Sequence, residues 1–173
     1  MKEDASDFDG AADAHQKPMF FYGTLMNVRI LERVIGRPSS KLTIQPAQIT
    51  GYCRFKIRDA HYPGLLPASA AEVALNRPPT LEEQTVTGTL VSGLSATDVA
   101  LLDAFEGEEY ESQTAHINLM DSNRPPVEAI VYIYAPAIVS QKVLPCVWSY
   151  DEFLNSHLSQ WIADPSMYRY DRS

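Results

Sequence analysis

The residue best placed to do chemistry in this sequence is Glu106, which follows Phe105 and precedes Gly107. Ser95 and Asp98, three positions apart, are typical of a helix start, and the helix should end near Gly107. Glu106 then lies at the helix C-terminus, where the negative end of the helix dipole disfavours a charged carboxylate. Burial beside Phe105 would raise its pKa further. The position predicts a carboxyl group that can exchange a proton near neutral pH.

The turn at residues 22–27, which reads Tyr-Gly-Thr-Leu-Met-Asn, is the second candidate. The apolar residues before it predict a short buried strand, and a helical pattern occupies residues 27–35 after it. Gly23 permits backbone angles that other residues resist, so the chain can turn sharply between the two. Such a junction leaves backbone N–H groups without partners, and these donors can bind an anion or a polarised carbonyl. An ordinary structural turn fits the same residues, so the turn alone leaves both interpretations open.

The composition is that of a globular domain. The chain has 173 residues, 45% of them hydrophobic, so a single domain with a sizeable core is expected. Its net charge of −8 argues against nonspecific binding to nucleic acid or acidic membranes. The sequence contains no apolar run long enough to cross a bilayer, and its acidic first residues do not resemble a signal peptide. We therefore expect a cytoplasmic protein.

Several catalytic classes lack their motifs in this sequence. There is no Cys-x-x-Cys and no histidine pair at helical spacing, so a zinc site is not expected. No nucleophile elbow, phosphate-binding loop or dinucleotide fingerprint is present. Cys53 and Cys146 form no disulfide framework and are interpreted as core or half-buried thiols. What remains as a candidate for chemistry is the carboxyl group of Glu106 and the turn at residues 22–27.

The order of elements predicts one domain at residues 18–163, between a flexible tail at 1–17 and a C-terminal tail at 164–173. Strands are predicted within residues 42–57, 85–91, 113–119 and 127–134, and a last helix at residues 149–161. Pro46 is expected to mark an edge or a bulge, and Gly51 a kink. Residues 59–67 are expected to form a loop, and residues 68–84 a surface excursion.

Three further side chains could have either a structural or a functional role. His61, which stands just before a Pro-Gly turn, is interpreted as an exposed loop histidine. His157 shares a helical stripe with Phe153 and Trp161, and is interpreted as packed rather than catalytic. Tyr132 fits either a pocket or plain packing with its hydroxyl in water, and the sequence leaves both open.

Other acidic residues surround Glu106 in the sequence. Asp103, three residues earlier on the helix, is assigned a structural role. Glu108, Glu109 and Glu111 are interpreted as a solvated acidic surface, the usual environment of clustered carboxylates.

Four motifs together resemble those of a known family. They are the turn Tyr22-Gly23-Thr24-Leu25, the segment Tyr-Pro-Gly-Leu-Leu-Pro at 62–67, the segment Leu-Leu-Asp-Ala-Phe-Glu-Gly-Glu-Glu-Tyr at 101–110, and Trp-Ser-Tyr-Asp-Glu-Phe at 148–153 followed by His157. Their order and spacing over residues 18–162 are similar to the gamma-glutamylcyclotransferase superfamily, and within it to the AIG2-like branch of plants and fungi. The resemblance implies an α+β fold, with a small mixed sheet curled toward a barrel, helices packed outside and a pocket near one end.

The resemblance also implies an intramolecular acyl transfer. The substrate's own α-amino group attacks its γ-glutamyl carbonyl, the ring closes to 5-oxoproline, and an amine leaves. Because the substrate supplies the nucleophile, the enzyme needs no reactive Ser or Cys. The reaction that the resemblance implies also requires no metal and no organic cofactor. Glu106 would be the catalytic acid and base. The residues that would bind the substrate are Tyr22, Gly23, Thr24, Leu25, Met26, Asn27, Tyr62, Tyr110 and Tyr132.

Two alternatives remain open at this point. The same pocket and glutamate could serve another reaction, such as a lyase or acyl-transfer step in fungal secondary metabolism. The fold could instead belong to a non-catalytic small-molecule-binding or stress-response protein. In each case the expected partner is a small molecule, without nucleic acid or membrane, and the oligomeric state is open.

Overall fold

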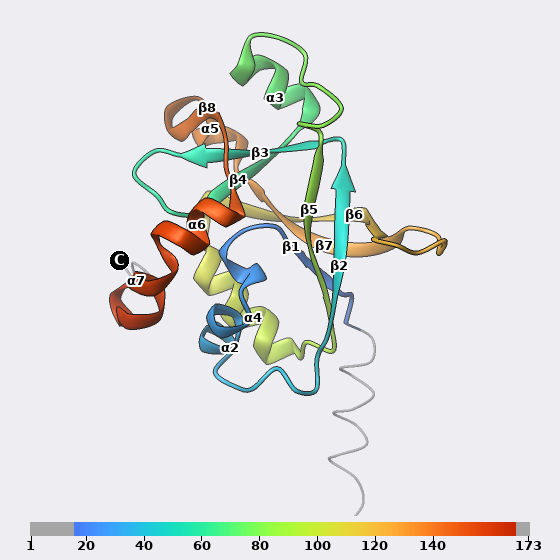
Figure 1. Cartoon of the computed structure of the whole chain (residues 1–173), viewed down its shortest axis with the longest axis vertical. Helices are drawn as coiled ribbons and strands as arrows, with labels where there is room; N and C mark the ends of the chain where they lie inside the picture. The colour runs from blue at the N-terminus through green and yellow to red at the C-terminus, as the bar shows by residue number, and fades with distance from the viewer. Residues whose placement is uncertain (1–15, 169–173) are drawn as a thin grey trace, which may run out of the picture.

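Five strands form a closed barrel at the centre of the protein (Figure 1). The computed structural model describes residues 16–168. The barrel consists, in spatial order, of β1 (Met19–Phe21), β5 (Thr85–Ser92), β2 (Thr43–Thr50), β6 (Tyr110–Leu119) and β7 (Val127–Tyr134). β1 pairs with β7 in parallel, and the other neighbours pair antiparallel. The α+β class and the sheet curled toward a barrel, both predicted from the sequence, are confirmed.

The short strand β1 is buried on both faces. Phe20 belongs to the cluster that fills the barrel, together with residues such as Val131 of β7. Met19 and Phe21 belong to a different cluster, which lies between the barrel and the helices. Successive residues of a strand point to opposite sides, so three apolar residues in a row are what a strand buried on both faces requires.

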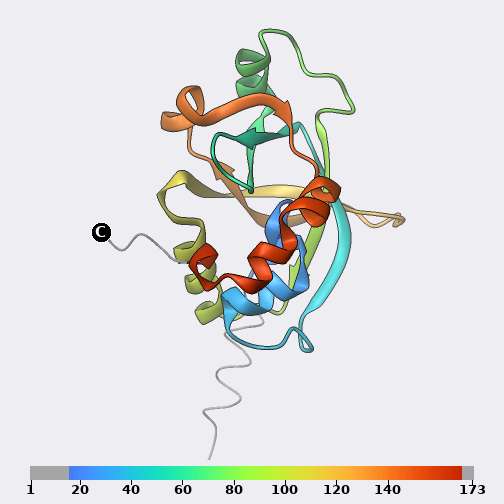
Figure 2. The ribbon, with the colours of Figure 1, turned by 60° about the vertical axis from the view of Figure 1, so that its left-hand side comes forward.

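The helices α2 (Val28–Ile35) and α4 (Ala96–Glu106) lie together against one side of the barrel, with α6 (Tyr150–Ser156) and α7 (Leu158–Ala163) beside them (Figure 2). Ser95 caps α4, and Ser95 and Asp98 form the predicted capping box. Asp98 also pairs with Arg37, which follows α2 and thereby joins the two helices. α4 ends at Glu106, as predicted, so the candidate carboxyl group lies at its C-terminus.

A second sheet, in the order β4-β3-β8, lies at one end of the barrel (Figure 1). Its strands are β4 (Pro63–Pro67), β3 (Tyr52–Ile57) and β8 (Val143–Val147), and α3 (Ala68–Leu75) and α5 (Pro136–Lys142) lie with it. Gly51, with φ of +85°, forms the expected kink between β2 and β3. Pro46 was expected to mark an edge or a bulge. It pairs with Thr89 of β5 in regular register, so that described ladder has no bulge there, whereas the described pairing of β2 with β6 includes only Ala47 and Gln48, so Pro46 lies at the edge of that ladder.

The prediction of a loop at residues 59–67 is wrong in part. Residues 63–67 are not a loop but the strand β4, which pairs antiparallel with β3. Leu65 and Leu66 are both buried, and the prolines occupy the two ends of an edge strand, where a missing N–H disrupts the ladder least. The surface excursion expected after β4 begins with the helix α3, whose Ala-rich sequence favours a helix. Val73 of this helix is exposed, as expected of a segment on the surface.

The expected single helix at residues 149–161 is two helices. His157 separates α6 from α7, and its backbone angles, φ of −130° and ψ of −20°, are not helical. His157 stacks on His61, with ring centroids 4.0 Å apart, and this packing accompanies the break. Of the two thiols, Cys53 is buried as expected, whereas Cys146 is exposed on β8. Within residues 16–168, no helix is long and apolar enough to span a membrane.

Candidate active site

A cavity of about 490 Å³ is bounded by the turn after β1, the end of α4 and the neighbouring strands β6 and β7. The predicted site residues that line it are Tyr22, Gly23, Thr24, Leu25, Tyr62, Glu106, Tyr110 and Tyr132. The structure places Met26 and Asn27 outside this lining. Asn27 instead caps α2, where its side chain accepts hydrogen bonds from the N–H groups of Arg29 and Ile30. The volume suits a small molecule.

Glu106 is poised to exchange a proton. Its side chain keeps some accessible surface, but it lines the cavity, and the surrounding protein excludes most of the water that would stabilise a charge. Burial raises the pKa of Glu106 from 4.5 to about 8, and the charge of Asp103 contributes to the rise. Asp103 precedes Glu106 by three residues on α4 and therefore lies on the same helix face. The structural role assigned to Asp103 from the sequence did not include this effect of its charge on the pKa of Glu106.

Four tyrosines surround this carboxyl group. Burial raises the pKa of Tyr22, Tyr62, Tyr110 and Tyr132, and the nearby charge of Glu106 adds to each rise. Their hydroxyl groups are therefore protonated at neutral pH, and each donates its hydrogen to a protein oxygen atom.

Tyr132 has both a packing and a cavity role. Its Oη donates to the carboxylate of Asp103 at 2.6 Å, so the hydroxyl is held by protein rather than by water. Its main-chain oxygen accepts the hydroxyl of Tyr22 at 2.5 Å. These contacts connect β7 to the end of β1 on one side and to α4 on the other, which fixes the cavity wall around Glu106.

The turn after β1 forms a short 3₁₀ helix, η1 (Thr24–Met26). Its first internal bond runs from the N–H of Met26 to the carbonyl of Gly23, at 3.0 Å. The N–H groups of Thr24 and Leu25 precede that bond and have no acceptor inside the turn. Gly23 lies tightly against β4, because a Cβ at this position would be 2.8 Å from Cδ of Pro63. A side chain of any size would therefore push the turn away from β4.

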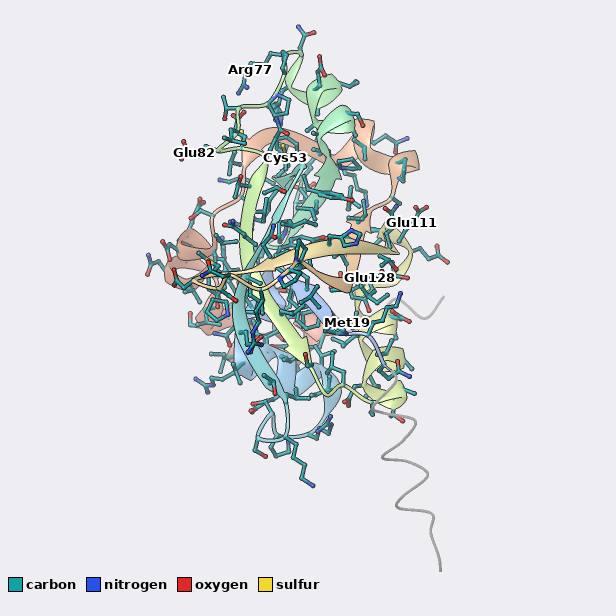
Figure 3. All side chains as sticks on the ribbon, turned by 90° about the vertical axis from the view of Figure 1, so that its right-hand side faces the viewer. Met19, Cys53, Arg77, Glu82, Glu111 and Glu128 are labelled. Carbon is teal, nitrogen blue, oxygen red and sulfur yellow. The ribbon has the colours of Figure 1, made fainter. Side chains whose placement is uncertain are left out.

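Glu109 does not behave as the solvated carboxylate expected from the sequence. It lines the cavity, accepts the hydroxyl of Tyr62 at 3.3 Å and pairs with Lys142 of α5 at 2.8 Å. Glu108 is exposed but also lines the cavity, whereas Glu111 is exposed on β6 and lies outside the lining (Figure 3). The interpretation of a plain acidic surface is therefore correct for Glu111 and wrong for Glu109.

His61 is half-buried, so its assignment as an exposed loop histidine is wrong. Its Nδ1 accepts the indole N–H of Trp161 at 3.1 Å, and its main-chain oxygen accepts that of Trp148 at 2.8 Å. Burial lowers the pKa of His61, and the stacked ring of His157 contributes. His157 is packed, as predicted. The two histidines anchor the C-terminal helices rather than line the cavity.

Two further contributions to the site have no signal in the sequence. Met167 and Tyr168 line the cavity although they belong to the predicted C-terminal tail, and Trp161 of α7 lines it as well. Arg54 of β3 donates through Nη1 to the carbonyl of Tyr22 at 2.7 Å and holds the turn from behind. Both contributions come from long-range packing, which the local pattern does not encode.

Arg54 is a charged residue whose guanidinium group is largely buried. Its guanidinium lies 5.2 Å from the ring centroid of Trp148, and its buried Nε has no acceptor among the described residues. Burial lowers its pKa to about 10, so it remains a cation at neutral pH.

Across residues 16–168, no cluster of three or more His, Cys, Asp or Glu side chains is arranged to hold a metal.

Comparisons with known proteins agree on the family. The model of the gamma-glutamyl cyclotransferase, AIG2-like family matches residues 19–150. AIG2-like protein D of Arabidopsis thaliana is 23% identical over 144 residues, which cover 83% of each chain. Two solution structures of Arabidopsis thaliana proteins show a similar fold. One, at 20% identity, has a TM-score of 0.59 and covers 84% of this chain and 77% of its own. The other, at 23% identity, has a TM-score of 0.55 and covers 88% and 90%. The chain therefore belongs to the gamma-glutamyl cyclotransferase, AIG2-like family.

Proposed function

We propose that this protein cyclises a γ-glutamyl amine or peptide to 5-oxoproline and releases the amine, with Glu106 as the general acid and base. The observation that carries the proposal is the position of Glu106, in a cavity opposite the turn after β1 and with its pKa raised to about 8. A carboxyl group with that pKa can both accept and return a proton at physiological pH.

The reaction begins with loss of a proton from the substrate's α-ammonium group to Glu106. The neutral amine attacks the γ-carbonyl carbon, and the lactam C–N bond forms while the bond to the leaving nitrogen breaks. The α-nitrogen loses two protons in becoming a lactam N–H, and the leaving nitrogen gains two in becoming an alkylammonium ion. The proton count balances without water or a co-reactant, so one carboxyl group suffices as a shuttle.

Binding in a folded conformation would supply much of the acceleration. Five-membered ring closure requires the α-amine and the γ-carbonyl to be held within contact distance, and such positioning is worth several orders of magnitude in rate. The N–H groups of Thr24 and Leu25 are suited to the substrate carboxylate or to the developing oxyanion. The tyrosine hydroxyls around Glu106 donate their hydrogens to protein oxygen atoms, so what they offer the same half of the substrate is lone pairs that can accept from its α-ammonium group.

The proposal is tested by incubating the full chain with a panel of γ-glutamyl compounds, including simple γ-glutamyl alkylamides, γ-glutamyl dipeptides and glutathione. We expect at least one compound to yield 5-oxoproline and its free amine in equal amounts, measured by mass spectrometry. Binding of panel members without release of 5-oxoproline would contradict the proposed reaction and favour a binding protein. Release of glutamate in place of 5-oxoproline would indicate hydrolysis instead.

A further inference from the structure

The C-terminal end of the described chain forms an aromatic wall of the cavity. Trp161 of α7 and Tyr168 of η3 (Pro165–Tyr168) line it together with Phe105 of α4. The ring centroid of Phe105 is 6.3 Å from that of Trp161 and 6.1 Å from that of Tyr168. Trp161 and Tyr168 are themselves 5.5 Å apart and meet edge to face. The three rings are therefore packed on one another and form a surface that exists before any ligand binds.

This aromatic wall is held in place from outside the cavity. The guanidinium of Arg33 lies 5.0 Å from the ring centroid of Tyr168, and Arg33 donates to the carbonyl of Ile162 at 2.7 Å. Trp161 donates its indole N–H to His61. These contacts fix the rings before a ligand binds. They therefore limit the conformational entropy of the side chains that is lost when a ligand binds against the rings.

The same cavity also has a polar lining. Glu106, the tyrosines and the turn after β1, whose first N–H groups have no acceptor inside the turn, suit the ammonium, carboxylate and amide groups of a γ-glutamyl moiety. Once the γ-glutamyl half lies against this polar lining, the group attached to the leaving nitrogen faces the aromatic wall. Glu108 adds an exposed carboxylate to the lining, which repels a negatively charged leaving group.

We propose that the aromatic wall of Phe105, Trp161 and Tyr168 is the leaving-group subsite, and that it selects γ-glutamyl amides of arylalkylamines without a carboxylate. This inference rests on the proposed function. The selected substrate releases 5-oxoproline and an arylalkylammonium ion, by the same bond changes and proton balance as above. Ring contacts stabilise the aryl group, and the absence of a second carboxylate avoids repulsion by Glu108.

Three matched compounds test the two parts of this selectivity. They are γ-glutamyl-phenethylamide, γ-glutamyl-ethylamide, which lacks the ring, and γ-glutamyl-phenylalanine, which adds only a carboxylate. We expect kcat/KM for the phenethylamide to exceed that for the ethylamide by about tenfold or more, because a fitted apolar group gives discrimination of this size. We expect it to exceed that for the phenylalanine compound by roughly fivefold at low salt, and by less at high salt.

Substitutions assign each preference to its residue. Tyr168→Ala should reduce the ratio between phenethylamide and ethylamide, whereas Tyr168→Phe, which keeps the ring, should preserve it. Glu108→Lys should reduce or reverse the ratio between phenethylamide and the phenylalanine compound. Glu111→Lys makes the same charge change outside the cavity and should leave that ratio as it is. Circular dichroism confirms that each variant is folded.

The results separate this inference from the proposed function. Equal kcat/KM for phenethylamide and ethylamide would overturn the aromatic subsite, and a preference for the phenylalanine compound would overturn the role of Glu108. If only another γ-glutamyl compound of the panel released 5-oxoproline, the aromatic subsite would be overturned while the proposed function held. If no compound of the panel did, the proposed function would fail, and calorimetric binding of the three compounds would decide the subsite. Tightest binding of the phenethylamide would support it, and equal or absent binding would reject it.

Discussion

At the scale of single residues, the site depends on two carboxyl groups of α4 that differ in environment. Glu106 lines the cavity and burial raises its pKa to about 8, whereas the carboxylate of Asp103 accepts a hydrogen bond from the hydroxyl of Tyr132. The fixed charge of Asp103 disfavours a second negative charge one helical turn away. Two neighbouring carboxyl groups can in this way take different protonation states at one pH.

Asp103→Asn tests this electrostatic coupling. Asparagine keeps an oxygen that can accept the Tyr132 hydroxyl but removes the charge, so the pKa of Glu106 should fall. The pH profile of kcat/KM, measured on one confirmed substrate, should then show its rising limb at lower pH than in the unsubstituted protein. Glu111→Gln, which removes a charge outside the cavity, should leave the limb where it is. An unshifted limb in Asp103→Asn would mean that Asp103 does not tune Glu106.

The sequence predicted some of these residues because their signals are local. A capped helix that ends at a glycine located Glu106 at a helix C-terminus, and the structure has it there. The contacts of Glu109 with Tyr62 and Lys142, and of His61 with Trp161, join positions far apart in the chain. No periodicity or spacing encodes such pairs, so their assignment to the solvated surface was wrong.

At the scale of elements, the site depends on how closely the turn after β1 approaches β4. Gly23 allows this approach, because any Cβ there would meet the ring of Pro63. Arg54 of β3 supports the same turn through the carbonyl of Tyr22. The second sheet therefore positions the turn, although none of β3 lines the cavity.

Gly23→Ala should displace the turn by enough to impair turnover. Its Cβ would lie 2.8 Å from Cδ and 2.9 Å from Cγ of Pro63, which is closer than carbon atoms approach without movement. We expect kcat/KM to fall by roughly a hundredfold, the scale of a displacement of about 1 Å at a reacting centre. Steady-state kinetics measure this loss.

A second substitution provides the control for Gly23→Ala. Pro63→Ala removes the two carbon atoms that the new Cβ would meet, so the double variant should recover part of the lost kcat/KM. If the double variant were no better than Gly23→Ala, the steric explanation would be wrong. Melting temperatures of all three variants show whether any loss comes from unfolding.

Elements with strong local patterns were predicted, and elements made by tertiary packing were not. β7 alternates between two faces, α4 has a capping box at its start and a glycine after its end, and both elements lie where the sequence indicated. β4 contains two prolines and a glycine in five residues, so its composition is that of a turn, and only pairing with β3 makes it a strand. The break between α6 and α7 accompanies the stacking of His157 on His61, which the helical stripe gave no reason to expect.

At the scale of the whole molecule, the cavity lies where the barrel, the second sheet and the C-terminal helices meet. Residues from both ends of the described chain line it, from Phe20 to Tyr168. Burial of an ionisable group at this junction couples folding to pH. The folded state holds the proton of Glu106 up to about pH 8, whereas an unfolded chain releases it near 4.5.

Glu106→Gln should therefore stabilise the protein, and more so as the pH rises. The protonated carboxyl is favoured in the fold, so its contribution is fully present below about pH 4.5 and is lost as the pH rises to about 8. Chemical denaturation at pH 5 and pH 8 measures the free energy of unfolding of both proteins. The gain from Glu106→Gln should be larger at pH 8, and taking the difference between the two proteins cancels the titration of other groups such as His61.

The exposed residue Glu111 provides the matched control. Glu111→Gln should change the free energy of unfolding by the same small amount at both pH values, because Glu111 is exposed on β6 (Figure 3) and is not part of the cavity lining. A gain from Glu106→Gln that did not grow with pH would contradict the raised pKa of Glu106.

The most direct test of the central claim is the rate at which Glu106→Gln releases 5-oxoproline from a substrate that the unsubstituted protein cyclises. Glutamine keeps the size of the side chain but cannot carry a proton, so turnover should fall by about 10²–10⁴-fold while the fold and ligand binding are retained. Turnover within a few-fold of the unsubstituted protein would show that another group moves the proton, and would contradict Glu106 as the catalytic acid and base.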